Sequence, residues 1–397
     1  MRCAAHGTGI AKVKYLPLLW SNLTRHKTRL VFTLLSVVFA FLLFGMLMAI
    51  REAFTLGANY AGADRLLTMS AVSLTVSLPI SYGERIADVK GVERVNPQAW
   101  VGGYYQDPRN PIFAMAVRSQ DFFAMYPEYS IPVAQQRAWL ADKRGVIVGA
   151  ALAQAYGWKI GQQVPLRSNI WRDAKGNNTW DVVVDGIYTS SQRGGDNQLF
   201  MHYRYLDDAR AFANNSVSWF VLQIANPAAA GQVAPAVDAL FANSPYETRT
   251  STEKAFVSNF AAQFGDIGAI VTAVVSAVLF TMLLVTANTM AQSVRERTAE
   301  LAVLKAVGFG NARLVGLVLA ESLLLTLVGG ICGLALSYAV IGAIPGALLQ
   351  FLPGLYLPVQ GAGLGVLLML LLGVLAALLP VSRTVRLQVV MALRSAG

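Results

Sequence analysis

Four stretches of the sequence are dominated by apolar residues, and we interpret each one as a membrane-spanning helix. They cover residues 30–50, 267–291, 314–344 and 362–381. A helix needs roughly 20 apolar residues to cross a bilayer. Glu321 is the one charged residue in these stretches. The pattern predicts one span, a long polar interval, and then three closely spaced spans.

Two of these stretches have an alternative interpretation. Residues 30–50 could be the apolar core of a signal peptide, but such a core is usually about 7–15 residues long, so we prefer an uncleaved span. Residues 314–358 could hold two spans, but glycines and prolines interrupt their second half. These are Gly342, Pro345, Gly346, Pro353 and Pro358. We therefore predict a single span over 314–344 and a short periplasmic loop over 345–361.

The interval 51–266 has the short alternating segments of a folded α+β domain. Strand patterns cover Leu74–Leu78, Ile112–Val117, Val146–Val148, Asp181–Ile187 and Trp219–Ile224. Helical patterns cover Tyr82–Asp88, Ala151–Tyr156, Tyr205–Ala213 and Ala229–Phe241. The two cysteines, Cys3 and Cys332, lie outside this interval, so no disulfide within the domain stabilises its core.

Residues 145–166 carry the clearest local pattern of that domain. A strand enclosed by Gly145 and Gly149 precedes a short helix, a turn at Gly157 and Gly161, and a second strand. Glycine gives such turns their backbone freedom. A phosphate-binding loop would need a following Lys-Ser or Lys-Thr pair, which this segment lacks. We therefore interpret the pattern as structural.

The net charge of +10 is confined to the segments outside the 51–266 domain, in which basic and acidic residues are equal in number. Lys and Arg gather before the first span, between the second and third, and after the fourth. Because basic residues mark the cytoplasmic side, we place residues 1–29, 292–313 and 382–397 in the cytoplasm and the domain in the periplasm. This distribution reflects membrane topology, so it argues against nucleic-acid binding.

The resulting fold class is an α-helical membrane protein with four transmembrane helices and a large α+β periplasmic domain between the first and second. We expect residues 1–29 to include an interfacial helix on the lipid bilayer, over Tyr15–Leu23. The expected location is the bacterial inner membrane, crossed several times.

Catalytic chemistry finds little support in this sequence. The domain has one histidine, His202, without a G-x-S-x-G motif, and no H-E-x-x-H motif is present. The sequence has no G-x-x-x-x-G-K-[ST] and no L-S-G-G-Q, so we expect no ATP-binding site in this chain. We predict a protein that is not an enzyme and holds no metal or cofactor.

The connector between the second and third predicted spans, residues 292–313, has an amphipathic helical pattern. Apolar Leu301, Leu304 and Val307 recur at helical spacing after a charged turn, and Gly308 and Gly310 end the helix. The pattern alone allows two interpretations. The segment could be a solvated connector, or it could be a short helix continuous with both spans that transmits force from a soluble partner.

The connector resembles the coupling segment of the MacB/FtsX-like ABC transporter permease family. The family pattern is approximately R-x-x-E-[IL]-x-x-[LM]-[KR]-A-[LVI]-G. The matching residues are Arg297, Glu300, Leu301, Leu304, Lys305, Ala306, Val307 and Gly308. Residues 23–34, 145–166 and 380–394 also resemble the entry to the first span, the periplasmic core domain and the cytoplasmic tail of that family. The tail departs from it where Val389 or Val390 stands in place of a proline.

The resemblance implies a complex in which two permease subunits, identical or different, bind two ABC ATPase subunits that hold ATP and Mg²⁺. It implies that ATPase motion enters through the coupling segment. The residues concerned are Arg295, Arg297, Glu300, Leu301, Leu304, Lys305 and Gly308. A periplasmic adaptor and efflux of periplasmic or membrane-derived substrate are further expectations. A lipoprotein-releasing permease and a non-transporting FtsX-type regulator of a cell-wall hydrolase remain alternatives.

Two features of the third span complete the prediction. Gly329 and Gly333 form a small-xxx-small pair, which lets two helices approach closely. We therefore expect them at a helix–helix contact. Glu321 is costly inside hydrocarbon, so it either lies near the interface or has a coupling or gating role.

Overall fold

The computed structural model describes residues 27–385, except 61, 63, 193, 263–265 and 345–354. The expected interfacial helix, most of the tail and much of the predicted 345–361 loop lie outside the described residues. The chain divides into two compact units. One, the helical unit, is made by residues 1–52, 266–343 and 356–397, and the other, the α+β unit, by residues 53–265 and 344–355.

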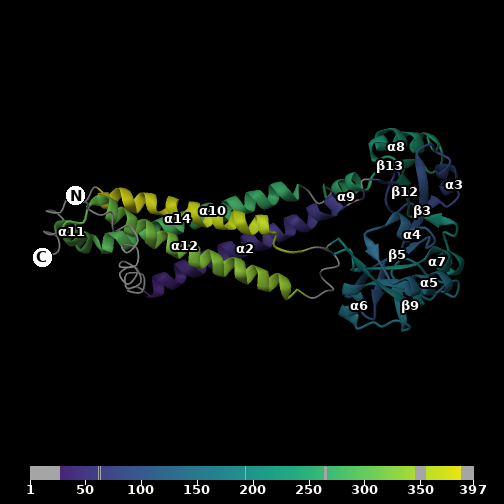
Figure 1. Cartoon of the computed structure of the whole chain (residues 1–397), viewed down its shortest axis with the longest axis horizontal. Helices are drawn as coiled ribbons and strands as arrows, with labels where there is room; N and C mark the ends of the chain where they lie inside the picture. Colours follow the sequence, from purple (N-terminus) through teal and green to yellow (C-terminus); the bar gives the residue numbers. More distant parts are fainter. Residues whose placement is uncertain are drawn as a thin grey trace, which may run out of the picture. The chain divides into compact units, whose positions relative to one another are not determined.

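Four long helices build the helical unit and run lengthwise beside one another (Figure 1). They are α2 (Lys27–Tyr60), α10 (Ile267–Glu296), α12 (Asn311–Gly342) and α14 (Val359–Val385). Each is long and apolar enough to cross a membrane. The prediction of four apolar helices is therefore confirmed, and residues 311–342 form one helix, not two. The short helix α11 (Thr298–Ala306) lies between α10 and α12.

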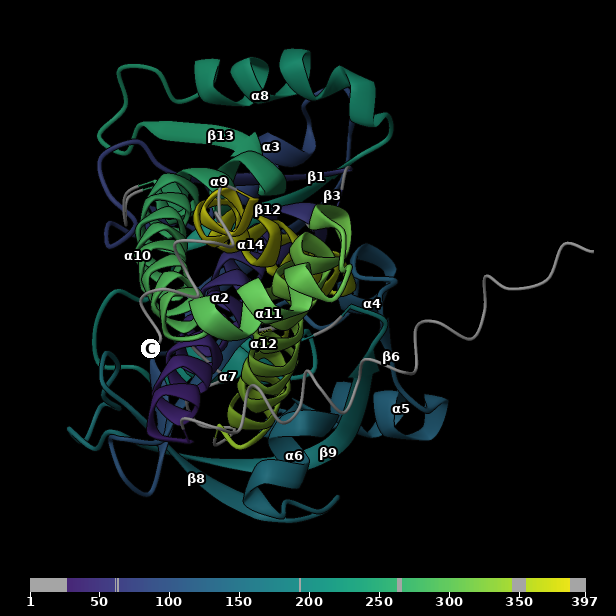
Figure 2. The ribbon, with the colours of Figure 1, turned by 90° about the vertical axis from the view of Figure 1, so that its left-hand side faces the viewer.

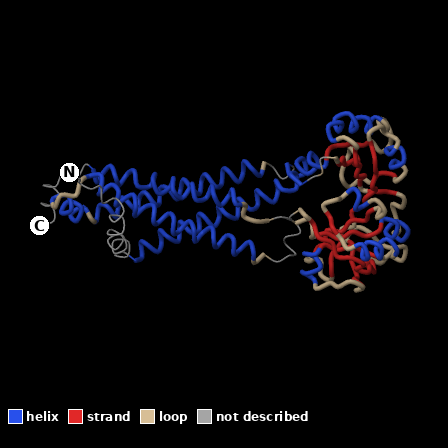
Figure 3. Tube along the Cα trace, viewed as in Figure 1, coloured by secondary structure: helices blue, strands red, loops and turns tan. Residues whose placement is uncertain are grey.

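The α+β unit contains the strands, as Figure 3 shows by colour. Its main strands are β1 (Arg65–Ser70), β3 (Val92–Trp100), β4 (Gly103–Tyr105), β5 (Pro111–Val117), β7 (Gly145–Gly149), β8 (Gln163–Ser168), β9 (Thr179–Ser190), β10 (Gln198–His202), β12 (Trp219–Ile224) and β13 (Thr248–Thr252). Three two-residue strands are also present: β2 (Leu78–Pro79), β6 (Tyr129–Ser130) and β11 (Ser216–Val217).

The strand pairing closes part of the sheet into a ring. The order β10–β7–β9–β8–β4–β5 returns to its start because β5 also pairs with β10, in parallel. From β5 the ladder continues through β3, β12 and β1 to β13 in antiparallel pairs. The α+β unit is thus a closed ring of strands that shares β5 with an open antiparallel extension.

Short helices pack around this sheet. They are α3 (Tyr82–Ala87), α4 (Phe122–Met125), α5 (Val133–Ala141), α6 (Ala150–Tyr156), α7 (Tyr203–Ala209), α8 (Ala230–Ala239) and α9 (Glu253–Ala262), with a 3₁₀ turn at Pro227–Ala229. Figure 2 shows α8 beside β13. There the Asp238 carboxylate accepts hydrogen bonds from the Thr250 backbone N–H, at 2.9 Å, and from the Thr248 and Thr250 hydroxyls. Among the described strands, β13 pairs with β1 alone.

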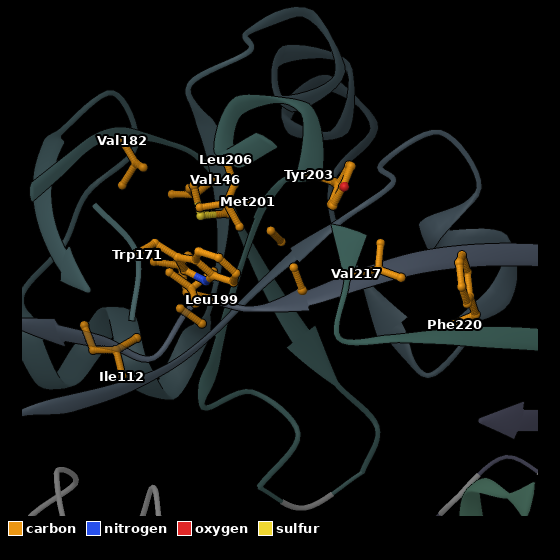
Figure 4. Close-up of a cluster of buried hydrophobic side chains, with 14 of the residues drawn as sticks. Ile112, Val146, Trp171, Val182, Leu199, Met201, Tyr203, Leu206, Val217 and Phe220 are labelled. Carbon is orange, nitrogen blue, oxygen red and sulfur yellow. The ribbon is translucent and has the colours of Figure 1, made fainter. Parts of the chain in front are cut away.

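Two apolar clusters form the core of this unit. The larger one gathers inward side chains of the ring and of the extension, such as Ile112, Val146, Leu199 and Phe220 (Figure 4). Along β8, for example, exposed and buried side chains alternate, because successive side chains of a strand point to opposite faces. One face of the strand therefore contributes to the core. The second cluster is rich in aromatic residues around the fully buried Phe122. Burial of both clusters supplies the main stabilisation of the unit.

The predicted secondary structure of this unit is partly confirmed. Strands lie at 112–117, 146–148, 181–187 and 219–224, and the strand–helix–turn–strand pattern of 145–166 holds, with positive φ angles at Gly157 and Gly161. The strand at Leu74–Leu78 is wrong, because only Leu78 joins one. The Ser73 hydroxyl accepts the Thr75 backbone N–H at 3.2 Å, and such local bonds favour turns over strands.

The stability of the α+β unit depends on pH through Asp185 of β9. Its Oδ2 is buried and accepts no hydrogen bond from the described residues. Burial, and secondly the charge of Asp142, raise the pKa of Asp185 from 3.8 to about 6. Because folding favours the protonated form, the stability that this group contributes is fully present below pH 3.8 and is lost as the pH rises through about 6.

We therefore expect Asp185→Asn to stabilise the full-length protein at about pH 8, by roughly 1 kcal/mol or less because solvent screens the charge, and to change nothing at about pH 4. Thermal unfolding at both pH values measures this. Asp181→Asn is the control, since Asp181 is exposed on the same strand. An equal gain from Asp185→Asn at both pH values would contradict the assignment.

Candidate coupling site

The segment that joins α10 to α12 is the candidate site, and it begins with a break in the helix. The backbone of Arg297 leaves the helical conformation, with φ −106° and ψ 14°, between the end of α10 and the start of α11. The Thr298 hydroxyl donates to the Arg295 carbonyl oxygen at 2.8 Å, which satisfies one of the acceptors that a helix end leaves free. The expectation of a helix continuous with both spans is therefore wrong.

The segment ends in a second turn, at Gly308. Its φ is +102°, a conformation that L side chains rarely adopt. The N–H of Phe309 donates to the Leu304 carbonyl at 3.0 Å and that of Gly308 to the Lys305 carbonyl at 3.2 Å. Gly310 then precedes α12. The prediction that glycines end this helix is confirmed, and α11 is a separate short helix between two turns.

One face of α11 packs into the helical unit. Leu301 is 3% exposed and Ala302 is fully buried. Leu301 belongs to a cluster with Met290, Val294, Leu314, Val318 and Leu325, and Leu304 packs against the same cluster. Two of the residues that the family pattern assigned to coupling, Leu301 and Leu304, therefore attach α11 to its own chain.

The opposite face of α11 presents apolar side chains to the outside. Val303 is 50% exposed, and Val307, the residue directly after α11, is 76% exposed. With exposed Glu300 they recur at positions i, i+3 and i+7, which share one face of a helix. Sequence reasoning named Glu300 as a coupling residue but omitted Val303, and it placed Val307 in the apolar spacing and in the family pattern without assigning it to coupling. The i, i+3, i+7 repeat is the signal that would have found this face.

Ion pairs surround the break at Arg297. An Arg297 guanidinium nitrogen lies 3.1 Å from a carboxylate oxygen of Glu321 on α12. A second nitrogen of Arg297 lies 3.5 Å from Glu300. The neighbouring Glu296 pairs with Arg29 near the start of α2, at 2.7 Å. Arg295 is exposed and Lys305 is half-buried.

Glycines, which have no side chains, allow α12 to lie close to its neighbours. A Cβ placed on Gly333 would lie 2.8 Å from the Cβ of Phe41, and one on Gly329 would lie 2.8 Å from the Cβ of Val37, both on α2. The Ser322 hydroxyl of α12 donates to the Gly373 carbonyl of α14 at 2.8 Å. In the described structure, α12 therefore contacts α11, α2 and α14.

The described residues of the α+β unit that could have suggested a site pack against their neighbours. His202 is half-buried, and its Nε2 is 2.7 Å from the Trp139 carbonyl oxygen. Burial lowers the pKa of His202. Aromatic side chains of the domain also pack together, as Trp100 does against Phe113. No group of three or more metal-ligating side chains occurs among the described residues.

Comparisons with known proteins agree with this architecture. Residues 30–240 match the family model of the MacB-like periplasmic core domain, and residues 254–389 match that of the FtsX-like permease C-terminal region. The chain is therefore a membrane protein of the permease class, with four apolar helices and an α+β domain between the first and the second. It belongs to the MacB/FtsX-like ABC transporter permease family.

Individual relatives extend the comparison. Over 159 residues the chain is 32% identical to the uncharacterized ABC transporter permease YknZ of Bacillus subtilis, and the match spans 38% of each chain. The extracellular domain of YknZ from Gram-positive bacteria is 14% identical, with a TM-score of 0.35, over 47% of this chain and 100% of that one. The periplasmic region of MacB from Actinobacillus actinomycetemcomitans is 8% identical, with a TM-score of 0.36, over 50% and 94% respectively.

Proposed function

We propose that this protein is the membrane subunit of an ABC transporter and that a separate ATPase, which binds ATP and Mg²⁺, docks on α11. The observation that supports this is the exposed pair Val303, in a short helix between two spans, and Val307, directly after that helix. These two valines lie one helical turn apart, and adjacent exposed apolar side chains with a polar rim fit a surface that a partner protein covers. The charged rim, with Glu300 and Arg295, suits a protein interface.

The contacts of α11 support a mechanical role. Motion of α11 would reach α12 through the Leu301 cluster, and α12 contacts α2 through Gly329 and Gly333. Helix α2 is one continuous helix that ends at Tyr60, shortly before the first strand of the α+β unit. Packed helices of this kind convert a displacement at one end into a discrete rearrangement. The chain would thus transmit work done by the ATPase to the domain on the other side of the membrane.

The finer proposal is efflux of a periplasmic or membrane-derived substrate from the inner membrane of a bacterium. It includes a second permease subunit, identical or different, and a periplasmic adaptor. Two other functions share the same layout: release of lipoproteins, and regulation of a cell-wall hydrolase without transport. Crosslinking of the full-length protein in cells separates the three, because each predicts a different protein bound to the α+β unit: an adaptor, an acylated lipoprotein or a hydrolase.

The proposal is tested at α11 with Val303→Asp and Val307→Asp in one chain. Each carboxylate would be desolvated in an apolar interface, so we expect loss of the bound ATPase, by at least about tenfold in affinity. The affinity-tagged protein is purified from its native membranes, and the Mg²⁺-dependent ATP hydrolysis that copurifies with it is measured.

Val72→Asp and Val133→Asp are matched controls, because both valines are exposed on the α+β unit, at 81% and 62%. They should leave the copurified hydrolysis unchanged. Equal retention of ATP hydrolysis by the α11 variant and by the controls would argue against α11 as the docking helix.

A further inference from the structure

Arg297 and Glu321 form a charged contact inside the helical unit. Their side chains are 12% and 5% exposed. Glu321 lies ten residues after Asn311, the first residue of α12, so it is about 15 Å along that helix. Close to it in sequence, Val318 and Leu325 belong to the buried cluster that receives Leu301. The ion pair therefore lies beside the buried apolar cluster.

A contribution to folding stability does not by itself explain why a buried ion pair is present here. Removing two charges from water costs about as much as their attraction returns, so an apolar pair of similar size often stabilises a protein equally well. Buried ionic contacts have a clearer use in fixing one arrangement among several. The pair joins the helix break to the first half of α12, so it could fix the arrangement of the break and that helix.

The break at Arg297 is the position at which the chain could bend between α10 and α11. Arg297 is the single residue between α10 and α11, and its backbone is not helical. A change in its two backbone dihedrals would swing α11 without moving α10. The side chain of Arg297 also contacts α12. The neighbouring ion pair is more exposed, since the side chains of Glu296 and Arg29 are 47% and 24% exposed.

We propose that the Arg297–Glu321 ion pair locks α11 at a fixed angle to α12, so that a displacement of α11 moves α12 instead of bending the chain at Arg297. The inference deepens and rests on the proposed function, because the displacement would come from the docked ATPase. Glu321 is then a positioning residue, which acts through Arg297 and contacts no partner.

The first test measures the lock without any ATPase. The full-length protein carries Cys3→Ser and Cys332→Ser. Spin labels are attached at two exposed positions, Val307→Cys directly after α11 and Tyr338→Cys on α12. In lipid nanodiscs we expect one narrow distance distribution. Glu321→Gln should broaden it, and the charge exchange Arg297→Glu with Glu321→Arg should restore the narrow distribution. Glu296→Gln, next in sequence but in the more exposed pair, should leave it narrow.

The second test measures transmission in unlabelled protein purified with its copurifying ATPase. Glu321→Gln should keep the bound ATPase but lose the ATP-dependent change in protease sensitivity of the α+β unit, and the charge exchange should restore it. An unbroadened distribution in Glu321→Gln, or a charge exchange that rescues neither measurement, overturns the lock. Absence of any ATPase from the wild-type preparation would instead count against the proposed function, and the distance measurement would still decide the lock.

Discussion

Replacing Arg65 by methionine should unfold the α+β unit at a much lower denaturant concentration than the wild type requires. Arg65 is only 4% exposed in its side chain, and its guanidinium lies 2.7 Å from carboxylate oxygens of both Glu128 and Glu253. It also donates to the Met125 carbonyl at 2.9 Å and lies 4.5 Å from the centre of the Tyr126 ring. Without it, two largely buried carboxylates lose their cation. Breaking a buried pair in this way costs about 3–5 kcal/mol.

This experiment has two internal controls. Arg94→Met removes an exposed arginine, 3.8 Å from Glu93, and surface pairs contribute about 0–1 kcal/mol. The triple variant Arg65→Met, Glu128→Gln and Glu253→Gln removes the uncompensated charge and should recover part of the loss. Intrinsic tryptophan fluorescence of the full-length protein in urea gives the unfolding midpoint. Similar midpoints for Arg65→Met and Arg94→Met would refute the buried-charge argument.

The second large effect is expected from Gly333→Leu in α12. A Cβ at this position would lie 2.5 Å from the Val38 carbonyl oxygen and 2.8 Å from the Cβ of Phe41. Neither the backbone nor a Cβ can rotate away, so α2 and α12 must separate. Overpacking of this kind costs about 1–3 kcal/mol and sometimes more, and the smaller Gly333→Ala should cost less than leucine.

Gly316→Leu is the matched control on the same helix, since nothing lies within 4 Å of a Cβ at Gly316. Thermal unfolding of the full-length protein in one detergent, followed by scanning fluorimetry, compares the variants. Gly333→Leu should lower the unfolding temperature clearly, and Gly316→Leu should change it little. If the two variants unfold at the same temperature, the close contact between α2 and α12 is wrong.

The membrane helices could be predicted from sequence because the signal is local and long. A bilayer requires about 20 apolar residues in one run, so hydropathy finds α2, α10, α12 and α14 without knowledge of their neighbours. The strands were harder to predict. Strand β1, for instance, contains polar residues whose burial is explained only by their contacts with neighbouring strands. Thr68, for example, forms a hydrogen bond of 2.8 Å with the Thr250 hydroxyl of β13.

The coupling segment shows where sequence reasoning stops. The family pattern located α11 and its glycines correctly, but it could not tell which residues face the helical unit. Leu301 and Val303 are equally apolar in sequence, yet one is 3% exposed and the other 50%. Arg297 and Glu321 were each noted, but nothing over their 24-residue separation indicates that they touch. Such contacts are set by tertiary packing, which no local pattern records.

The Asp238 side chain has a consequence for how other macromolecules can approach the α+β unit. An unpaired backbone edge is a template on which a foreign chain can polymerise. At β13 the carboxylate already occupies the Thr250 N–H, and at the other end of the ladder ring closure leaves β10 with partners on both sides. A foreign strand therefore gains no main-chain hydrogen bond from the Thr250 N–H or from either side of β10, so a macromolecule that binds at these two places has to recognise side chains.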